Sequence, residues 1–404
     1  MDTVKREIFE YIEDNDIIEK EFALQIGCSP QLLSDAKLGK NLNFRVLLKA
    51  SIIMFGKDYL NKIETWSLKL NYTEGIKHAF EYAALTRNTT LLEKLLKQHE
   101  NSSGTIAECV QIYKIIHEFM LFKIEKTDFL SHIEQVKGVK TKSLVLLLEI
   151  LRLYGIFYKK KYSLILDILP EVEKKINSIK DGRESFLKES FLVRCSELYA
   201  PVLFELNDLV NARFYAETLI NSNICAKLVS DGYYYMGMSY LIEDPERCLL
   251  NLTSSYNTLK GRHRQLSELA LSNLNFARSY LSKELIAGET NCDIIIFNKI
   301  KRNKEITREE KSHIMNSESL FAYYYNSLEE RSFEMLNNSV SKFINKKQIF
   351  FANLVLQDIK KSNPGVLVAD GLFNINFIQE GTSKNEKTNY NCFTDLNGIS
   401  LNCG

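Results

Sequence analysis

Apolar residues recur every three or four positions along most of the chain, a period typical of amphipathic helices. The 404 residues include only 5 prolines and 17 glycines, so few breaks interrupt the pattern. Strand-like alternation is rare, and we therefore predict a nearly all-α fold. One helix pair is expected to have its first helix end at Tyr158 and its second near Pro170. The other predicted helix pairs cover residues 74–99, 105–136, 183–221, 224–259, 262–300 and 309–345.

One predicted pair carries the spacing of a tetratricopeptide repeat. Its first helix has aromatic, apolar–glycine and tyrosine positions at helical intervals, followed by a turn: Tyr233, Met236, Gly237, Tyr240 and Asp244-Pro245. In such repeats these positions lock two helices together. Because most of the other pairs lack the full signature, we predict a degenerate α-solenoid of tetratricopeptide-like repeats. The concave face of a solenoid suits an extended peptide.

The segment EFALQIGCSPQLLSDAKLGK, residues 21–40, predicts two short helices joined by a tight turn. Ala23 allows the helices to cross closely, Gly27 permits a left-handed turn, and Leu33 points back into the core. Ser29 is expected to cap the second helix, and Pro30 suits its first turn. This spacing is that of a DNA-binding helix-turn-helix, although helical hairpins of this shape also serve as plain packing units.

The charge pattern changes at the end of the predicted recognition helix. Residues 1–36 hold three Lys or Arg against nine Asp or Glu, and residues 37–69 hold seven against two. DNA recognition needs cations that contact phosphates and short polar side chains that reach base edges. The alternative is a solvated basic face on an ordinary helix. The predicted DNA-binding residues are Ser29, Gln31, Ser34, Lys37, Lys40, Asn41 and Arg45.

A second candidate surface lies in the middle of the chain, where four side chains follow one another at helical intervals. They are Lys227, Asp231, Tyr234 and Met238. Inside a solenoid, this stripe would offer a peptide a cation, a carboxylate, an aromatic ring and a soft apolar group. The alternative is that Tyr234 and Met238 belong to the core between repeats.

Composition and motifs exclude several classes of function. The net charge is +1, so any contact with DNA must come from a local patch. No apolar run is long enough to span a membrane, and the acidic N-terminus does not fit a secretory signal. The 8 cysteines and 6 histidines lack metal-ligand spacing, and the sequence has no phosphate-binding loop or catalytic motif. We therefore predict a cytoplasmic protein that is not an enzyme, uses no cofactor or metal, and has no membrane partner.

Three regions are predicted along the chain. Residues 1–70 are expected to form the helix-turn-helix domain, residues 71–362 the helical repeat domain, and residues 363–404 an irregular tail. The tail begins at Asn363-Pro364-Gly365, where the helical period is lost and polar residues become common. Its segment GLFNINFIQ suits a short strand or two.

Several segments, in order along the chain, resemble the arbitrium peptide receptors of phages. The longest is ESFLKESFLVRCSELYAPVLFELNDLVNARFYAETLINSNI, which is similar to the family's Lys-Glu-Ser-Phe segment and the helix after it. WSLKLNYTEGIKHAFEYA resembles the junction between the DNA-binding domain and the first repeat, and CVQIYKIIHEF resembles a Lys-Val-Tyr-x-x-His stretch. ESLFAYYYNSLEE is similar to a C-terminal Tyr-Tyr segment. The resemblance covers about residues 15–362 and leaves out the tail.

This resemblance implies a homodimer that binds double-stranded operator DNA, with a short signalling peptide held in its repeats, as in the control of phage lysis and lysogeny. The family's peptide-gripping positions correspond to Pro201, Glu205, Lys227 and Met238, and only Lys227 keeps a charge of the right sign. A lysine cannot reproduce the bidentate grip of an arginine on a carboxylate. Either this protein therefore binds a different peptide, or it has lost the response to peptide. Because Glu205 and Asp231 offer acceptors and Lys227 offers a donor, we predict a short peptide of mixed charge rather than the peptide of other family members.

The resemblance also implies where two copies of the chain would contact each other. Dimer contacts are expected toward the C-terminal helices, at Tyr323, Tyr324 and Phe333, with burial in the core as the alternative.

The alternative to the whole interpretation is a helical-repeat module that binds another protein and does not bind DNA. The predicted peptide-binding residues are Glu205, Asn207, Lys227, Asp231, Tyr234, Met238, Asn273 and Asn275.

Overall fold

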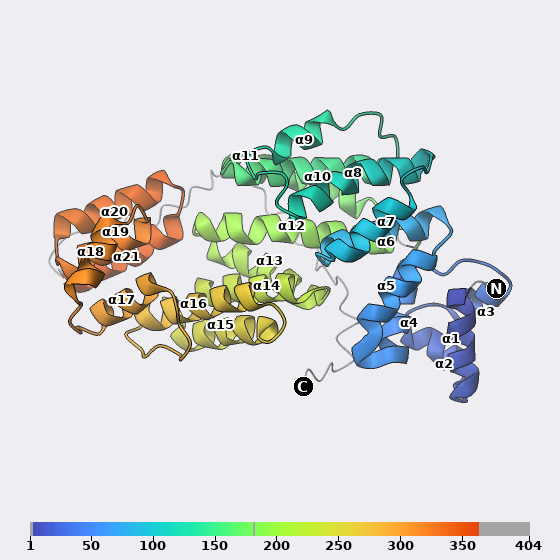
Figure 1. Cartoon of the computed structure of the whole chain (residues 1–404), viewed down its shortest axis with the longest axis horizontal. Coiled ribbons are helices and arrows are strands. Elements are labelled where there is room, and N and C mark those ends of the chain that lie inside the picture. The colour runs from blue at the N-terminus through green and yellow to red at the C-terminus, as the bar shows by residue number, and fades with distance from the viewer. Residues whose placement is uncertain (1–2, 181, 363–404) are drawn as a thin grey trace. The chain divides into compact units, whose positions relative to one another are not determined.

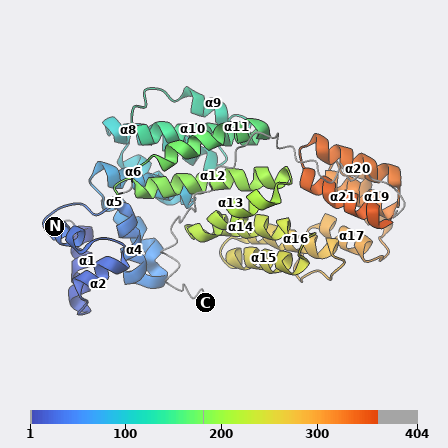
Figure 2. The ribbon, with the colours of Figure 1, turned by 180° about the vertical axis from the view of Figure 1, so that it is seen from behind.

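The computed structural model describes residues 3–180 and 182–362, and every regular element in these ranges is helical. This confirms the predicted all-α fold, which Figures 1 and 2 show from two sides. The elements before residue 181 are α1 (Thr3–Asp14), α2 (Glu19–Gln25), α3 (Pro30–Lys37), α4 (Phe44–Phe55), the 3-10 helix η1 (Gly56–Asp58), α5 (Tyr59–Lys69), α6 (Thr73–Leu85), α7 (Thr89–Gln98), α8 (Gly104–Met120), α9 (Phe129–Gln135), α10 (Lys142–Tyr158) and α11 (Tyr162–Asn177). The elements after it are α12 (Ser185–Glu205), α13 (Leu209–Ser222), α14 (Ala226–Ser239), α15 (Pro245–Leu259), α16 (Arg264–Tyr280), α17 (Cys292–Lys301), α18 (Arg308–Asn316), α19 (Leu320–Glu329), α20 (Phe333–Asn345) and α21 (Ile349–Ser362).

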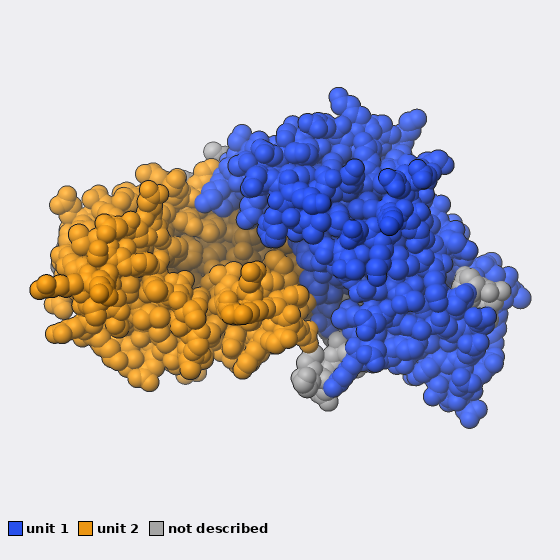
Figure 3. Space-filling view, in the orientation of Figure 1, with its two compact units in different colours: residues 1–195, 222–225, 391–404 blue, residues 196–221, 226–390 orange. Residues whose placement is uncertain are grey.

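The chain divides into two compact units, which Figure 3 shows in different colours. The described part of unit 1 is residues 3–180, 182–195 and 222–225, and that of unit 2 is residues 196–221 and 226–362. Helix α12 begins in unit 1 and ends in unit 2. The predicted domain boundary after residue 70 falls inside unit 1, between α5 and α6, and it stays a prediction.

In unit 1, α2 and α3 form the expected helix–turn–helix. Ala23 and Leu33 are buried between the helices, as the spacing predicts. Gly27 has a φ of 72°, in the left-handed region that favours glycine. A Cβ on Gly27 would also lie 2.9 Å from Nζ of Lys49, so a side chain there would have to displace the end of this lysine. The hydroxyl of Ser29 caps α3 by accepting a hydrogen bond from the Leu32 N–H at 3.1 Å.

In unit 2, α14 and α15 show the predicted repeat geometry. Pro245 occupies the start of α15, and the Asp244 carboxylate accepts a hydrogen bond from the Arg247 N–H at 3.1 Å. A Cβ on Gly237 would lie 2.9 Å from Cγ of Leu252, so glycine permits the close crossing of the two helices. The helical repeat region inferred from this spacing is therefore present.

A buried ion pair joins α6 to the part of α12 that lies in unit 1. Arg194 donates to both carboxylate oxygens of Glu81, at 2.7 and 3.1 Å, and the Tyr113 hydroxyl donates to the same carboxylate at 2.8 Å. All three side chains are buried. Because each donor meets an acceptor, this cluster fixes the packing of three helices without leaving an unsatisfied charge.

Two predicted helix boundaries differ in the structure. Helix α11 does not end near Pro170 but continues to Asn177, because Val172 and Ile176 extend its buried stripe beyond the proline. The predicted pair over residues 309–345 is three helices, α18 to α20, and the Ser332 hydroxyl caps the third. The predicted tail lies outside the described residues.

Candidate functional site

The outer face of α3 carries most of the predicted DNA-binding residues. One face of α3 is held in the core of unit 1 by the buried side chains of Leu33 and Ala36. Its opposite face and the loop after it are therefore presented to solvent. The exposed residues on this face are Ser29, Gln31, Ser34, Lys37, Lys40 and Asn41.

The cations of this face already have carboxylate partners. Lys40 Nζ lies 2.7 Å from Oδ2 of Asp35, and Gln31 donates to the other oxygen of Asp35 at 2.9 Å. The hydrogen bonds from Lys40 and Gln31 hold the pKa of Asp35 below its usual range. Lys37 forms an ion pair with Glu19 on α2. Part of the positive charge that the sequence places after residue 36 is therefore neutralised by carboxylates in the folded protein.

The same compensation occurs between α1 and α5. Glu7 on α1 lies 2.7 Å from Lys62 and 3.4 Å from Lys69, and it accepts a hydrogen bond from the indole N–H of Trp66 at 2.9 Å. Acidic residues of the first helices thus neutralise basic residues of α5. Spacing along the chain does not reveal this pairing, because the partners are more than fifty positions apart.

Arg45, unlike the other predicted DNA-binding residues, pairs with a helix outside the helix-turn-helix. Its Nη2 lies 3.1 Å from Oε1 of Glu189 on α12, and the two side chains are 26% and 14% exposed. The guanidinium therefore holds α4 to α12 inside unit 1. We remove Arg45 from the candidate DNA surface for this reason.

A lysine that the sequence analysis did not single out supports the loop after α3. Lys5 on α1 is buried, and its ammonium donates to the carbonyl oxygens of Gly39 at 3.1 Å and Lys40 at 3.3 Å. A cation near a helix C-terminus is favoured by the helix dipole. In the sequence, only the place of Lys5 beside Val4, on the buried side of α1, indicates that it supports this loop.

Four of the predicted peptide-binding residues lie together in unit 2. Lys227 and Asp231 form an ion pair on α14. Burial raises the pKa of Tyr234, and the nearby carboxylates of Glu205 and Asp231 raise it further. The stripe on α14 and the end of α12 thus combine two carboxylates, a cation and an aromatic ring.

The other predicted peptide-binding residues have different environments. Met238 is 1% exposed and therefore belongs to the core, as the alternative interpretation of the stripe expected. Asn275 is also buried, where its side chain donates to Ile286 O and Glu289 and accepts from the Ile286 N–H. Asn207 follows α12 with a φ of 65°, and Asn273 is half-buried on α16. We therefore remove Met238 and Asn275 from the candidate groove.

The predicted dimer residues also divide by exposure. Tyr324 is 1% exposed, and its hydroxyl donates to Asp358 in the core of unit 2. Tyr323 is half-buried beneath the Lys342 ammonium, and Phe333 is 40% exposed. Only Tyr323 and Phe333 remain candidates for a contact with a second copy.

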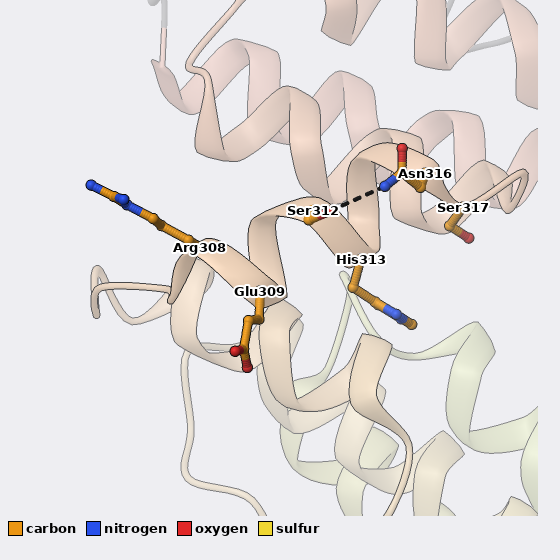
Figure 4. A pocket seen from close by; sticks show the side chains of 6 residues that line it. All are labelled: Arg308, Glu309, Ser312, His313, Asn316 and Ser317. Atoms are coloured by element: carbon orange, nitrogen blue, oxygen red, sulfur yellow. Dashed lines mark hydrogen bonds between the residues drawn. The ribbon is translucent and has the colours of Figure 1, made fainter.

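Two cavities differ in how their side chains are arranged. The first, of about 680 Å³, is lined only by residues of α18 and the position after it. Figure 4 shows that Asn316 and Ser312 face each other, joined by a hydrogen bond of 3.1 Å, whereas Arg308, Glu309 and His313 point in different directions. The second, of about 450 Å³, lies in unit 1. Its lining includes Asn41, Asn43, Tyr72, Glu74, His78 and Arg183.

The second cavity contains a group that the sequence spacing did not reveal. Glu74 and His78 lie one turn apart on α6, and Glu184 reaches them from the residue before α12. Burial, together with the nearby Lys77 ammonium, lowers the pKa of His78 to about 3, so the imidazole is neutral. Because Glu184 is 106 positions from His78 in the sequence, only the fold brings these ligand types together.

No helix within the described ranges has the length and apolar character needed to cross a bilayer. No curated protein matches the chain. A phAimR structure containing selenomethionine resembles it with a TM-score of 0.70 and 19% sequence identity, covering 90% of this chain and 97% of phAimR. A second structure, described as phAimR with ligand, gives a TM-score of 0.64 and 19% identity, covering 80% of this chain and 98% of phAimR. The family model described as AimR transcriptional regulator-like matches residues 60–361, which is most of the chain, and the protein therefore belongs to this family.

Proposed function

We propose that this protein is a cytoplasmic, homodimeric transcriptional regulator that binds operator DNA through α3 and responds to a short peptide, in arbitrium-type control of phage lysis and lysogeny. The observation that carries the proposal is the exposed polar face of α3 in a capped helix-turn-helix. Membership of a transcriptional regulator-like family supports the same role. Repressor-type hairpins place such a helix in the major groove.

Base recognition is assigned to Gln31 and Ser34, because both are exposed on α3. Phosphate contacts are assigned to Lys37 and Lys40. The two lysines are exposed, and their present partners Glu19 and Asp35 are 43% and 18% exposed; an ion pair at the surface contributes about 0–1 kcal/mol to stability. A phosphate can therefore replace either carboxylate at small cost.

Dimerisation is assigned to the C-terminal helices of unit 2. Phe333 is an exposed aromatic ring at the start of α20, and Tyr323 lies on α19. Two copies would present two α3 helices to half-sites separated by about one DNA turn, or a multiple of it. Light scattering at tens of micromolar tests this assignment, and a monomer at that concentration would contradict it.

The peptide is assigned to the stripe formed by Glu205, Lys227, Asp231 and Tyr234, with Asn207 and Asn273 as further hydrogen-bonding groups. A peptide that leaves water must find a partner for each of its polar groups. The stripe offers carboxylates to a basic group and an ammonium to an acidic one. This pattern supports a ligand of mixed charge.

The peptide assignment is tested by thermal shift against a panel of short synthetic peptides, including peptides encoded beside the gene. A ligand of the stripe should stabilise the wild-type protein and lose most of its effect with Lys227→Ala. Arg264→Ala is the matched control, because Arg264 forms an equally spaced i,i+4 pair with Glu268 on another helix of unit 2. A peptide that stabilises the wild type and Lys227→Ala equally would remove Lys227 from the site.

The second candidate function is a module that binds another protein and does not bind DNA. The ion pairs of Lys37, Lys40 and Arg45 favour this function, because all three charges are compensated within the chain. Selection of duplexes from a random pool by the full-length protein separates the two candidates. Enrichment of a common sequence supports the regulator. Recovery of an unselected pool, with no measurable affinity at low salt, supports the binding module.

A further inference from the structure

The group at the second cavity has the composition of a metal site. Glu74, His78 and Glu184 each place one potential ligand atom within 4.8 Å of the other two. The Nε2 atom of His78 lies 4.0 Å from Oε2 of Glu74. Around a tetrahedral zinc ion, ligand atoms lie about 3.4 Å apart, given metal–ligand bonds of about 2.0–2.2 Å. The required movement is therefore small.

His78 is the independent reason to expect a ligand. Its side chain is 1% exposed, and neither ring nitrogen has a hydrogen-bond partner among the described residues. Buried polar atoms are nearly always paired, and an exception calls for an explanation. The ring is held by Phe44 and Phe186, with ring centroids at 6.4 and 5.7 Å, so it is a fixed anchor that the carboxylates can approach.

The two carboxylates are partly exposed and are paired with a single cation. The Glu74 and Glu184 side chains are 39% and 29% exposed, and both face the cation that now holds them, the ammonium of Lys77. Lys77 Nζ lies 2.7 Å from Oε2 of Glu74, pairs with Glu184, and donates to Ser143 Oγ at 3.3 Å. A metal ion would compete with this ammonium for the same oxygens.

We propose that Glu74, His78 and Glu184 form a binding site for a divalent transition-metal ion, with Lys77 as the internal cation that the metal displaces. An imidazole nitrogen with two carboxylates suits zinc and its neighbours better than magnesium or calcium, which prefer oxygen ligands alone. A bound ion would join α6 to the residue before α12, beside Asn41 and Asn43 of the loop that follows α3. The proposal is independent of DNA and peptide binding.

The test measures Zn²⁺ binding to the full-length protein by calorimetry in chelator-buffered solutions. Lys77→Met should bind one ion per chain at least ten-fold more tightly than the wild type, because the competing ammonium is gone. Adding His78→Gln should abolish that gain. His313→Ala is the matched control, because His313 also faces a carboxylate, that of Asp293 at 2.8 Å, but lies in unit 2, outside the proposed site.

A second comparison keeps the test decisive if Lys77→Met does not fold, which the fluorescence of Trp66, the single tryptophan, would report. In the wild-type background, His78→Gln should then weaken Zn²⁺ binding at least ten-fold, and His313→Ala should leave it unchanged. Equal affinities for the wild type and His78→Gln would overturn the proposal. So would a gain in Lys77→Met that survives His78→Gln.

Discussion

Unit 1 contains ion pairs of the same chemistry in opposite environments. Lys37–Glu19 and Lys40–Asp35 involve exposed lysines of α3 and the loop after it, whereas Glu81–Arg194 is buried between α6 and α12. An exposed pair contributes about 0–1 kcal/mol, but removing one partner of a buried pair costs about 3–5 kcal/mol. The surface pairs can therefore exchange a carboxylate for a phosphate, and the buried pair cannot exchange its partner without loss of the fold.

The largest expected effect comes from the buried pair. Arg194→Met should lower the free energy of unfolding by about 3–5 kcal/mol, because Glu81 is left buried without its cation. Urea denaturation followed by Trp66 fluorescence measures the loss. Lys40→Met, at the surface, is the control and should change stability by less than about 1 kcal/mol. Similar losses for the two variants would contradict the comparison.

The next effect concerns base recognition by α3. Gln31→Ala and Ser34→Ala should each weaken binding to a selected duplex by about 1–3 kcal/mol, with little change for random DNA. Fluorescence anisotropy on both duplexes measures the difference. Gln111→Ala, an exposed glutamine on α8, should have no effect. If both α3 variants bind like the wild type, α3 does not contact the bases.

A smaller effect in the opposite direction is expected from the carboxylate that holds Lys40. Asp35→Asn removes the negative charge that Lys40 pairs with, and it should tighten binding to every duplex by a factor of about two to five, the equivalent of one exposed pair. Asp167→Asn makes the same change of net charge at an exposed position of α11. An equal gain in this control would assign the effect to net charge alone.

The smallest effect is a pH dependence of stability. Burial by itself would raise the pKa of Glu7, but hydrogen bonds from Lys62 and Trp66 outweigh it and hold the pKa below its usual value. A depressed carboxyl pKa stabilises the fold above the ordinary Glu value and loses this contribution as the pH falls through the folded-state pKa. The Tm of the wild type should therefore fall more steeply in acid than that of Glu7→Gln. Parallel curves would show that Glu7 is not coupled to folding.

The sequence predicted those features that depend on neighbouring residues. Ala23, Gly27 and Leu33 specify the helix-turn-helix because their roles follow from helical spacing and one left-handed turn. Gly237 likewise predicted the close crossing of α14 and α15. The failure at Pro170 has the same origin, because a local helix-breaking signal was outweighed by a buried stripe that continues to Ile176.

The sequence did not predict which charges meet in space. Arg45 and Glu189 are 144 positions apart, and Glu184 is 106 positions from His78, which it approaches. No periodicity connects such residues, so the sequence alone does not show that much of the basic segment is compensated. Burial at Tyr324, Met238 and Asn275 also depends on the packing of several helices, and a helical stripe alone does not decide which side faces solvent.

The central claim is that the exposed cations of α3 and its following loop bind DNA phosphates, and the salt dependence of affinity tests it most directly. The logarithm of the binding constant for a selected duplex should fall linearly with the logarithm of salt concentration. In the Lys37→Ala/Lys40→Ala variant, this slope should be shallower by about 0.9 for each phosphate that the variant no longer neutralises. Lys94→Ala, an exposed lysine on α7, should keep the wild-type slope. A double variant whose slope equals that of the wild type would contradict the account.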